Sequence, residues 1–213
     1  MTAIVVAPER RGAQSRAALL SAARRLFAEH GFHGTSVGDI ADAAGLRKPS
    51  LFHHFPTKEA LYRAVMEELF GELSGAIAGP VAAKGTYGER LDIVNDALVD
   101  FFTAKPEAAR LLFREALEPG AVMANEGVSR ALGILSGAEA FLAAGIAAGE
   151  FAKQDPKQLL LSITGLHLTY FALAPLVTPL IGAPLADPTV AVARRDAVRM
   201  QVRAMVVKPK PKK

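Results

Sequence analysis

Basic side chains and histidines gather in the segment 47–58, which reads RKPSLFHHFPTK. Lysine and arginine bind phosphate groups, and they also donate hydrogen bonds to guanine in the DNA major groove. Leu51 and Phe55 lie four residues apart, which is the spacing of one buried helix face. A helix at 48–55 therefore leaves a polar face exposed to a partner. That face carries Lys48, Ser50, His53 and His54.

The paired histidines have two other interpretations, as ordinary surface residues or as half of a metal site. Adjacent positions on a helix point about 100° apart, so His53 and His54 cannot easily share one ion. No acidic residue nearby has the spacing of a metal ligand. The sequence also lacks GxGxxG, P-loop and HExxH motifs, and it has no cysteine. We therefore expect no metal, no cofactor and no catalytic residue, and an enzyme is disfavoured.

Two amphipathic segments precede the polar-faced helix and are expected to position it. In 14–30 the apolar residues recur on one helical face, and Gly31 follows where a left-handed cap residue is favoured. The next helix opens with Ser36 and Asp39, whose three-residue spacing fits a capping box. Gly45 then makes a tight turn. Two short helices joined in this way, the second with a basic face, predict a helix-turn-helix.

A resemblance to the TetR family of bacterial transcriptional regulators is carried by the run LFAEHGFHGTSVGDIADAAGL at 26–46 and by PSLFHHFPTKEAL at 49–61. The resemblance covers about 14–62. It implies a three-helix DNA-binding domain followed by an all-helical regulatory domain. It also implies a homodimer that releases its operator DNA when a small molecule binds.

The resemblance assigns roles to residues by their position in the family pattern. Ser36 and Lys58 would contact phosphates. Four residues would lie at or near base edges and the flanking backbone: Lys48, Pro49, Ser50 and His53. Phe52 stands where the family usually has a tyrosine, so the phosphate hydrogen bond of that hydroxyl is missing. Arg47 stands where a serine or threonine usually caps the helix; it cannot cap in that way, but it can contact phosphate or guanine. Both stay in the expected DNA-contacting set.

The distribution of charge agrees with an oriented DNA binder. Residues 1–60 carry a net charge of +3, residues 61–207 a net −3, and the tail 208–213 adds +4. A basic end attracts phosphate while an acidic remainder is repelled. Segment 1–13 is expected to be a flexible basic leader and 208–213 a basic tail. Each could touch DNA, or serve only as a disordered leader and a solubilising tail.

An uncharged stretch at 158–186 is long enough to cross a bilayer. Three prolines interrupt it, and its unbroken helical part at 159–174 would rise only about 24 Å, less than the roughly 30 Å of a hydrocarbon core. We therefore expect a buried interface helix and no membrane span. The lack of cysteine and of a signal-peptide pattern fits a cytoplasmic protein.

Beyond the DNA-binding segment the chain is expected to be entirely helical, because no part has the alternation of a β-strand. A break is expected at Gly79–Pro80. Further helices are predicted at 58–78, 87–104, 106–117, 122–148, 156–174 and 188–207. The predicted fold class is therefore all-α with about nine helices. It comprises a helix-turn-helix domain at 14–62 and a larger effector-binding and dimerisation domain at 63–207.

The middle helices offer candidates for an effector cavity. They are Phe101, Phe113, Arg114, Phe141, His167 and Tyr170. Each has a structural alternative: phenylalanines at helical spacing are usually core, Arg114 could pair with Glu115, and a lone buried histidine is usually hydrogen-bonded. The last two helices have apolar faces, and the resemblance implies that they form a four-helix homodimer interface.

The leading hypothesis is a ligand-responsive regulator that binds double-stranded DNA. In its specific form, it is a homodimeric repressor released from a palindromic operator by a small, largely apolar effector. An architectural DNA-binding protein without an effector is the alternative, and a fully packed core would favour it. A helical enzyme is the remote third class.

Overall fold

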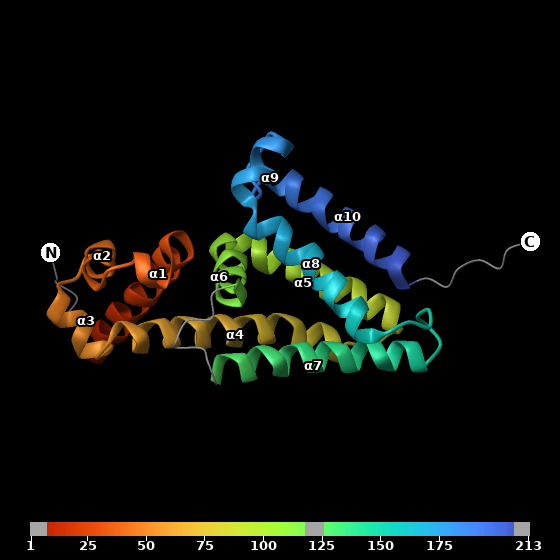
Figure 1. Cartoon of the computed structure of the whole chain (residues 1–213), viewed down its shortest axis with the longest axis horizontal. Coiled ribbons are helices and arrows are strands. Elements are labelled where there is room, and N and C mark those ends of the chain that lie inside the picture. The colour runs from red at the N-terminus through yellow and green to blue at the C-terminus, as the bar shows by residue number, and fades with distance from the viewer. Residues whose placement is uncertain (1–7, 118–125, 207–213) are drawn as a thin grey trace, which may run out of the picture.

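The computed structural model describes residues 8–117 and 126–206, and this part of the chain contains ten α-helices and no β-strand. The all-α fold is confirmed, with one helix more than expected. The helices are α1 (Pro8–Gly34), α2 (Val37–Ala43), α3 (Lys48–His54), α4 (Lys58–Ala82), α5 (Tyr87–Ala104), α6 (Pro106–Leu117), α7 (Glu126–Ala147), α8 (Pro156–Ala172), α9 (Ala174–Ile181) and α10 (Pro188–Val206). In Figure 1, α1–α3 form a lobe at one end, here called the head. Helices α5–α10 form the body, and α4 runs from one to the other.

The head follows the capping signals of its sequence. α1 bends at Gly31, whose φ of 75° lies in the left-handed region that glycine adopts without strain. Ser36 and Asp39 form the expected capping box at the start of α2. The turn between α2 and α3 contains Gly45 with a φ of 67°. These local signals fix where each short helix of the head begins and ends.

The hydrophobic core of the head continues into α4. Phe27 of α1, Ile40 of α2 and Leu51 of α3 have no exposed surface. Leu61 and Val65 of α4 are equally buried. Burial of one such side chain contributes about 1.5–3 kcal/mol to the free energy of unfolding. The first half of α4 is therefore packed into the head, and the head and α4 are expected to move together.

α4 is longer than its sequence suggested. Thr57 caps its start by accepting a hydrogen bond from the Ala60 backbone N–H. The expected break at Gly79–Pro80 does not occur, and the helix continues through Pro80 to Ala82. A proline removes one backbone hydrogen bond. Here that loss falls in the last turn, where few further helical bonds depend on it.

Other helix limits also differ from expectation. α1 begins at Pro8, so residues 8–13 are helical and not a flexible leader. α9 was missed because Pro175 and Pro179 suggested breaks. Pro175 occupies the first turn, where the missing N–H has no helical partner to lose. The remaining leader 1–7, the expected start of the 122–148 helix and the basic tail lie outside the described residues.

The centre of the body is made by α5 and α8. α5 packs against α4 and α10, and α8 packs against α6 and α7; Figure 1 shows α7 lying along α4. One face of α5 and one face of α10 meet through three antiparallel ion pairs. They are Asp92–Arg203, Asp96–Arg199 and Asp100–Arg195. Both sets recur every four residues, so this α5–α10 ladder lies along a single face of each helix.

The uncharged stretch forms two helices, not one. α8 and α9 are long and apolar enough to cross a membrane only if they are counted together as one span. The axes of the two helices are bent by 78° relative to each other. One straight segment, Ser129–Ala147 of α7, passes the same test by length and composition. One such helix is a weak indication of a membrane, because apolar helices in the cores of other folds pass it too.

Candidate DNA interface and internal cavity

The outer face of α3 presents Lys48 and His53 as its sequence pattern predicts, whereas His54 is half-buried. Leu51 and Phe55 face inward, with exposed fractions of 0% and 4%. Ser50 is half-buried. The exposed residues at and after the start of the helix are Arg47, Lys48, Pro49, Phe52 and His53. In Figure 1, α3 lies at the end of the head that is farthest from the body. A polar, partly basic face is thus available to a large partner.

Ser36 is exposed beside this face and is held by its capping box. Its Oγ accepts a hydrogen bond from the Asp39 backbone N–H at 3.1 Å, and the Asp39 carboxylate accepts one from the Ser36 N–H at 3.3 Å. The hydrogen bonds with Ser36, and to a smaller extent the charge of Lys48, hold the pKa of Asp39 below its ordinary value. The Ser36 hydroxyl therefore takes part in the cap, and its exposed position leaves it open to an outside group such as phosphate.

The two lysines of this segment occupy different environments. Lys48 is exposed, and its side chain passes close to the backbone of Gly38 in α2. A Cβ atom on residue 38 would lie only 2.8 Å from Lys48 Cε, so glycine leaves room for the lysine. Lys58 Nζ donates to the carbonyl oxygens of Phe32 and Thr35, at 2.8 and 3.1 Å, and lies over the Phe32 ring. Lys58 therefore closes the turn between α1 and α2, a structural role that the sequence pattern did not indicate. One of its three N–H groups remains for the expected phosphate contact.

Phe52 and Arg47, the two departures from the family pattern, both lie at this surface. Phe52 is 48% exposed although it is apolar. Arg47 occupies the N-cap position of α3, and its side chain makes no capping hydrogen bond. Exposed aromatic rings can contact the methyl group of thymine, and a guanidinium can contact phosphate or guanine. Both residues therefore stay in the candidate DNA interface.

The head is joined to the body at the end of α6. Arg114 donates hydrogen bonds to the carbonyl oxygens of Ala28 and Glu29 at 3.1 and 2.9 Å, close to the bend of α1. The next residue, Glu115, accepts a hydrogen bond from the hydroxyl of Tyr62 in α4. Burial first, then the hydrogen bond to Glu115 and its charge, raises the pKa of Tyr62, so the phenol stays protonated and donates. We call Arg114, Glu115 and Tyr62 the joint.

A charged network lies near the joint. Arg24 of α1 is 7% exposed and pairs with Glu68 and Glu72 of α4, both at 2.8 Å. Glu72 also pairs with Lys105, which follows α5, at 2.8 Å. Burial acts to raise the pKa of Glu72, but the hydrogen bonds from Arg24 and Lys105 outweigh it and the pKa is lowered. The network ties α1, α4 and the α5–α6 connection together.

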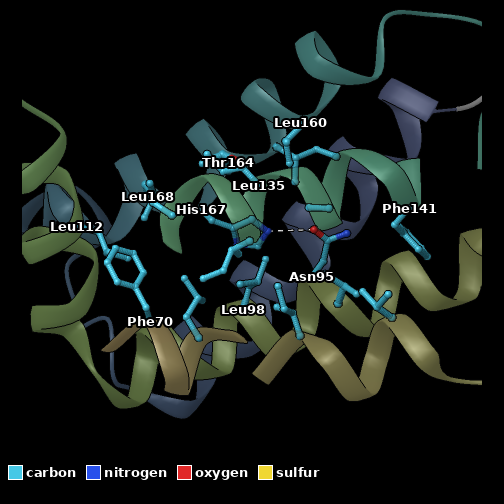
Figure 2. Close-up of a pocket in the computed structure, with 18 of the residues that line it drawn as sticks. Phe70, Asn95, Leu98, Leu112, Leu135, Phe141, Leu160, Thr164, His167 and Leu168 are labelled. Carbon is cyan, nitrogen blue, oxygen red and sulfur yellow. Dashed lines mark hydrogen bonds between the residues drawn. The ribbon is translucent and has the colours of Figure 1, made fainter. Parts of the chain in front are cut away.

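A cavity of about 420 Å³ lies in the body between α4, α5, α6, α7 and α8. This volume is in the range of small-molecule sites, which hold roughly 300–1,000 Å³. Figure 2 shows apolar side chains from these helices around it, among them Phe70, Leu98, Leu112, Leu135, Phe141, Leu160 and Leu168. The polar residues of its described wall are Asn95, Glu115, Thr164 and His167. No lysine or arginine belongs to that part of the wall.

His167 and Asn95 form a polar pair in this wall, joined by the dashed line in Figure 2. Asn95 Nδ2 donates to the Leu91 carbonyl oxygen at 2.9 Å, so the amide oxygen faces the imidazole. His167 Nε2 lies 3.0 Å from that oxygen and therefore carries the ring proton. His167 Nδ1 is then an acceptor, and it makes no hydrogen bond with the described residues. Burial, with a smaller effect of Arg194, lowers the pKa of His167 to about 4.

Two of the six candidate ligand residues, Phe141 and His167, line the cavity. Its described wall does not include the other four, Phe101, Phe113, Arg114 and Tyr170. Arg114 reaches α1 instead, and Tyr170 lies beneath Arg194, whose Cζ is 4.0 Å from the ring centroid. Helical periodicity identifies residues that point inward. It does not identify which interior space they reach.

Asn95 is a cavity residue that the sequence pattern does not single out. It shares one helical face with Leu91, Leu98 and Phe102, all of which line the cavity. An amide on an otherwise apolar stripe was the available signal, because a buried polar group needs a hydrogen-bonding partner. The partner, His167, comes from a distant part of the chain.

The described residues contain no metal-ligand set. Within 8–117 and 126–206, no three His, Asp or Glu side chains are grouped so as to hold an ion. His53 and His54 have ring centroids 5.5 Å apart and planes at 69°. Their arrangement suits surface contacts more than shared coordination.

Two family models match the chain. The model for bacterial regulatory proteins of the tetR family matches residues 19–65, which span the head and the start of α4. The model for the tetracyclin repressor-like C-terminal domain matches residues 89–202. The second match alone covers more than half of the 213 residues and includes most of α5 and α10 and all of α6–α9.

Individual proteins agree with these matches. The HTH-type transcriptional regulator RutR of Escherichia coli (strain K12) is 31% identical over 177 residues, 80% of each chain. The crystal structure of SCO4942 from Streptomyces coelicolor is 28% identical with a TM-score of 0.66, over 92% of this chain and 99% of that one. The crystal structure of AibR has the same fold, with a TM-score of 0.70 at 20% identity over 90% and 98%. The chain therefore belongs to the TetR family of bacterial regulatory proteins, and it is a DNA-binding transcriptional regulator rather than an enzyme.

Proposed function

We propose that the protein is a homodimeric repressor in the bacterial cytoplasm, released from a palindromic operator by a small, largely apolar effector. One observation carries the proposal: Glu115 lines the cavity and also accepts the hydrogen bond of Tyr62. Its neighbour Arg114 holds the end of α1. A molecule that fills the cavity therefore acts on the residues that connect the body to the head.

The direction of the response follows from geometry. Two recognition helices of a dimer must lie about 34 Å apart to enter successive major grooves. An effector that moves α6 moves α1 and α4 through the joint, so the head tilts and the spacing is lost. Because binding free energies are linked, DNA must weaken effector binding by the same factor by which the effector weakens DNA binding. AibR, which has the same fold, was crystallised with isovaleryl coenzyme A and operator DNA.

Dimerisation is supported by exposed apolar residues on α8 and α10. Leu161 of α8 is 59% exposed and Met200 of α10 is 67% exposed. Gly165 and Ala193 beside them are also exposed and allow close helix approach. We expect Met200→Glu to shift the protein from dimer to monomer in sedimentation velocity, because the interface would bury an unpaired carboxylate. Ala140→Glu on exposed α7 is the control, and a dimer in both variants would contradict this interface.

The cavity also weighs against the alternative function. An architectural DNA-binding protein needs no interior space, and its body would be expected to pack fully. The side chains around a cavity of about 420 Å³ lack van der Waals contacts on the side that faces the empty space. A bound ligand would supply these contacts. This comparison favours an effector-responsive regulator.

The decisive measurement is fluorescence anisotropy of the full-length protein on DNA from immediately upstream of its own gene, across a salt series. We expect binding that weakens steeply with salt, because basic residues displace condensed counterions. Lys48→Ala should lower the affinity by about fivefold or more. Lys153→Ala, an exposed lysine between α7 and α8, should leave it unchanged.

Failure on that fragment calls for one further step. A selection of binding sites from the whole genome shows whether any sequence is preferred. If no sequence is enriched over random DNA, the proposed operator binding is wrong. If an operator is found but no apolar compound releases it, the effector part of the proposal is wrong.

A further inference from the structure

The charged groups in the described wall of the cavity are of one sign only. That part of the wall holds one carboxylate, Glu115, and no lysine or arginine. His167 is 2% exposed and is neutral at pH 7, since its pKa is lowered to about 4. An anionic ligand would therefore meet a carboxylate and no lysine or arginine in the part of the wall that the structure describes. Such a charge would lose its hydration without gaining a partner.

The same wall contains an unused acceptor. Asn95 fixes the tautomer of His167 by accepting from Nε2 while its own Nδ2 is held by Leu91. Nδ1 of His167 is left with a lone pair and no hydrogen bond among the described residues. A buried acceptor without a donor costs free energy, and a ligand that supplies the donor recovers it. In Figure 2 the pair lies within a ring of apolar side chains, so a single polar group on the ligand is sufficient.

We propose that the cavity takes an uncharged, predominantly apolar molecule with a hydroxyl group, whose O–H donates a hydrogen bond to the His167–Asn95 pair. This inference rests on the proposed function, because it takes the cavity as the effector site. The remainder of the molecule is hydrocarbon and packs against leucine and phenylalanine side chains. An ether of the same chain length lacks the donor, and a carboxylate of that length carries the disfavoured charge.

The experiment compares three probes that share one hydrocarbon chain: 1-decanol, 1-methoxydecane and decanoate. Each is titrated into the full-length protein at pH 7.5 by isothermal titration calorimetry. We expect 1-decanol to bind at least about tenfold more tightly than either other probe, the ratio that one hydrogen bond to a buried polar group supplies. Wild-type protein alone gives this comparison, so it does not depend on any variant folding.

Two variants assign the preference to His167. His167→Leu removes the acceptor and should reduce the preference for 1-decanol over 1-methoxydecane to less than about twofold, since only apolar packing remains. Thr164→Val removes another hydroxyl from the same wall and keeps its shape; it should retain the preference. The melting temperature of each variant reports that it is folded.

The possible outcomes separate this inference from the proposed function. Equal binding of the three probes, tighter binding of decanoate or of the ether, or no binding of any overturns the inference. A full preference for 1-decanol in His167→Leu also overturns it. Operator binding in the anisotropy assay is independent of these results. If 1-decanol binds as expected but never affects DNA affinity, the ligand chemistry holds and the proposed effector role fails.

Discussion

At the scale of single residues, Lys48 and Lys58 show that position in a motif does not fix the role of a side chain. Both belong to the predicted DNA-binding segment. Lys48 stays exposed at the start of α3, whereas Lys58 donates to the carbonyl oxygens of Phe32 and Thr35. The first lysine is therefore available to DNA, and the second stabilises the fold of the head.

We therefore predict different effects of the same substitution at these two positions. Lys58→Met should lower the free energy of unfolding by about 1.5–3 kcal/mol, because two carbonyl oxygens lose a charged donor. Lys48→Met should change it by less than about 0.5 kcal/mol and should instead weaken DNA binding. Urea denaturation followed by circular dichroism, with anisotropy on DNA, measures both. A larger stability loss in Lys48→Met would contradict the assignment.

Buried His167 makes stability depend on pH. The pKa of His167 is about 4 in the folded protein, against 6.5 for an unperturbed histidine. Nearby on the side of α8 that faces α10, Arg194 lies over the ring of Tyr170. Between pH 6.5 and pH 4 the unfolded chain binds this proton and the folded chain does not. Stability from this residue is thus complete above pH 6.5 and is lost as the pH falls toward 4.

His167→Gln should remove that part of the pH dependence, because glutamine does not titrate. Relative to the variant, the wild type should lose about 3 kcal/mol of unfolding free energy between pH 7 and pH 4. Urea denaturation at fixed protein concentration across this range gives the difference. Parallel curves for the two proteins would show that His167 already takes up a proton near its ordinary pKa.

At the scale of elements, the register of α10 is set by the α5–α10 ladder. Three aspartates and three arginines, each set at four-residue spacing, meet along one face. Asp96 raises the pKa of Arg199 through a hydrogen bond and its charge. Sliding α10 by one turn would leave an end pair unmatched. The ladder therefore aligns the helix that carries exposed Met200 and, with it, the proposed dimer face.

A charge exchange tests the ladder. Asp96→Arg alone should lower the free energy of unfolding by on the order of 1 kcal/mol, a modest value because the pair is partly exposed. Adding Arg199→Asp should recover most of the loss, since the ion pair is rebuilt in reverse. Urea denaturation of the two single variants and the double variant gives the coupling. Additive losses in the double variant would show that the pair is not coupled.

At the scale of the whole molecule, the joint connects the wall of the cavity to the head that carries the candidate DNA interface. The wall residue Glu115 holds Tyr62 of α4, and Arg114 holds α1. α4 is packed into the head through Leu61 and Val65. In the proposed function, communication between the two ends passes through α6 and α4, and these contacts should control the response to the effector more than the affinity for DNA.

Tyr62→Phe tests this separation. Loss of the hydroxyl should leave operator affinity within about threefold of wild type, because Tyr62 is only 3% exposed and is not one of the expected DNA-contacting residues. The ratio of DNA affinities without and with effector should fall toward one, whereas allosteric coupling typically changes an affinity about 5–150-fold. Anisotropy with and without the releasing compound measures it. Tyr87→Phe, at a tyrosine that packs on the cavity residue Phe141, is the control. An unchanged ratio in Tyr62→Phe would exclude this route.

The sequence by itself determined the local structure of the head. Helices begin after Ser36, with Asp39, and after Thr57, and α1 bends at Gly31, as the side chains and backbone preferences of these residues indicate. The Leu51 face of α3 is buried as its spacing predicts. Capping and periodicity act between residues that are three or four positions apart, so they can be read without knowing the fold.

Tertiary structure decided the interior of the body and the joint. Asn95 and His167 are 72 residues apart in the chain, and Tyr62 and Glu115 are 53 apart. Each pair exists because packing brings two helices together, and no local pattern records which helices meet. Lys58 likewise reaches its acceptor, the Phe32 carbonyl oxygen, only because the start of α4 packs beside the end of α1. A sequence specifies which faces of its helices are apolar, but the contacts between those faces follow from how all the helices pack at once.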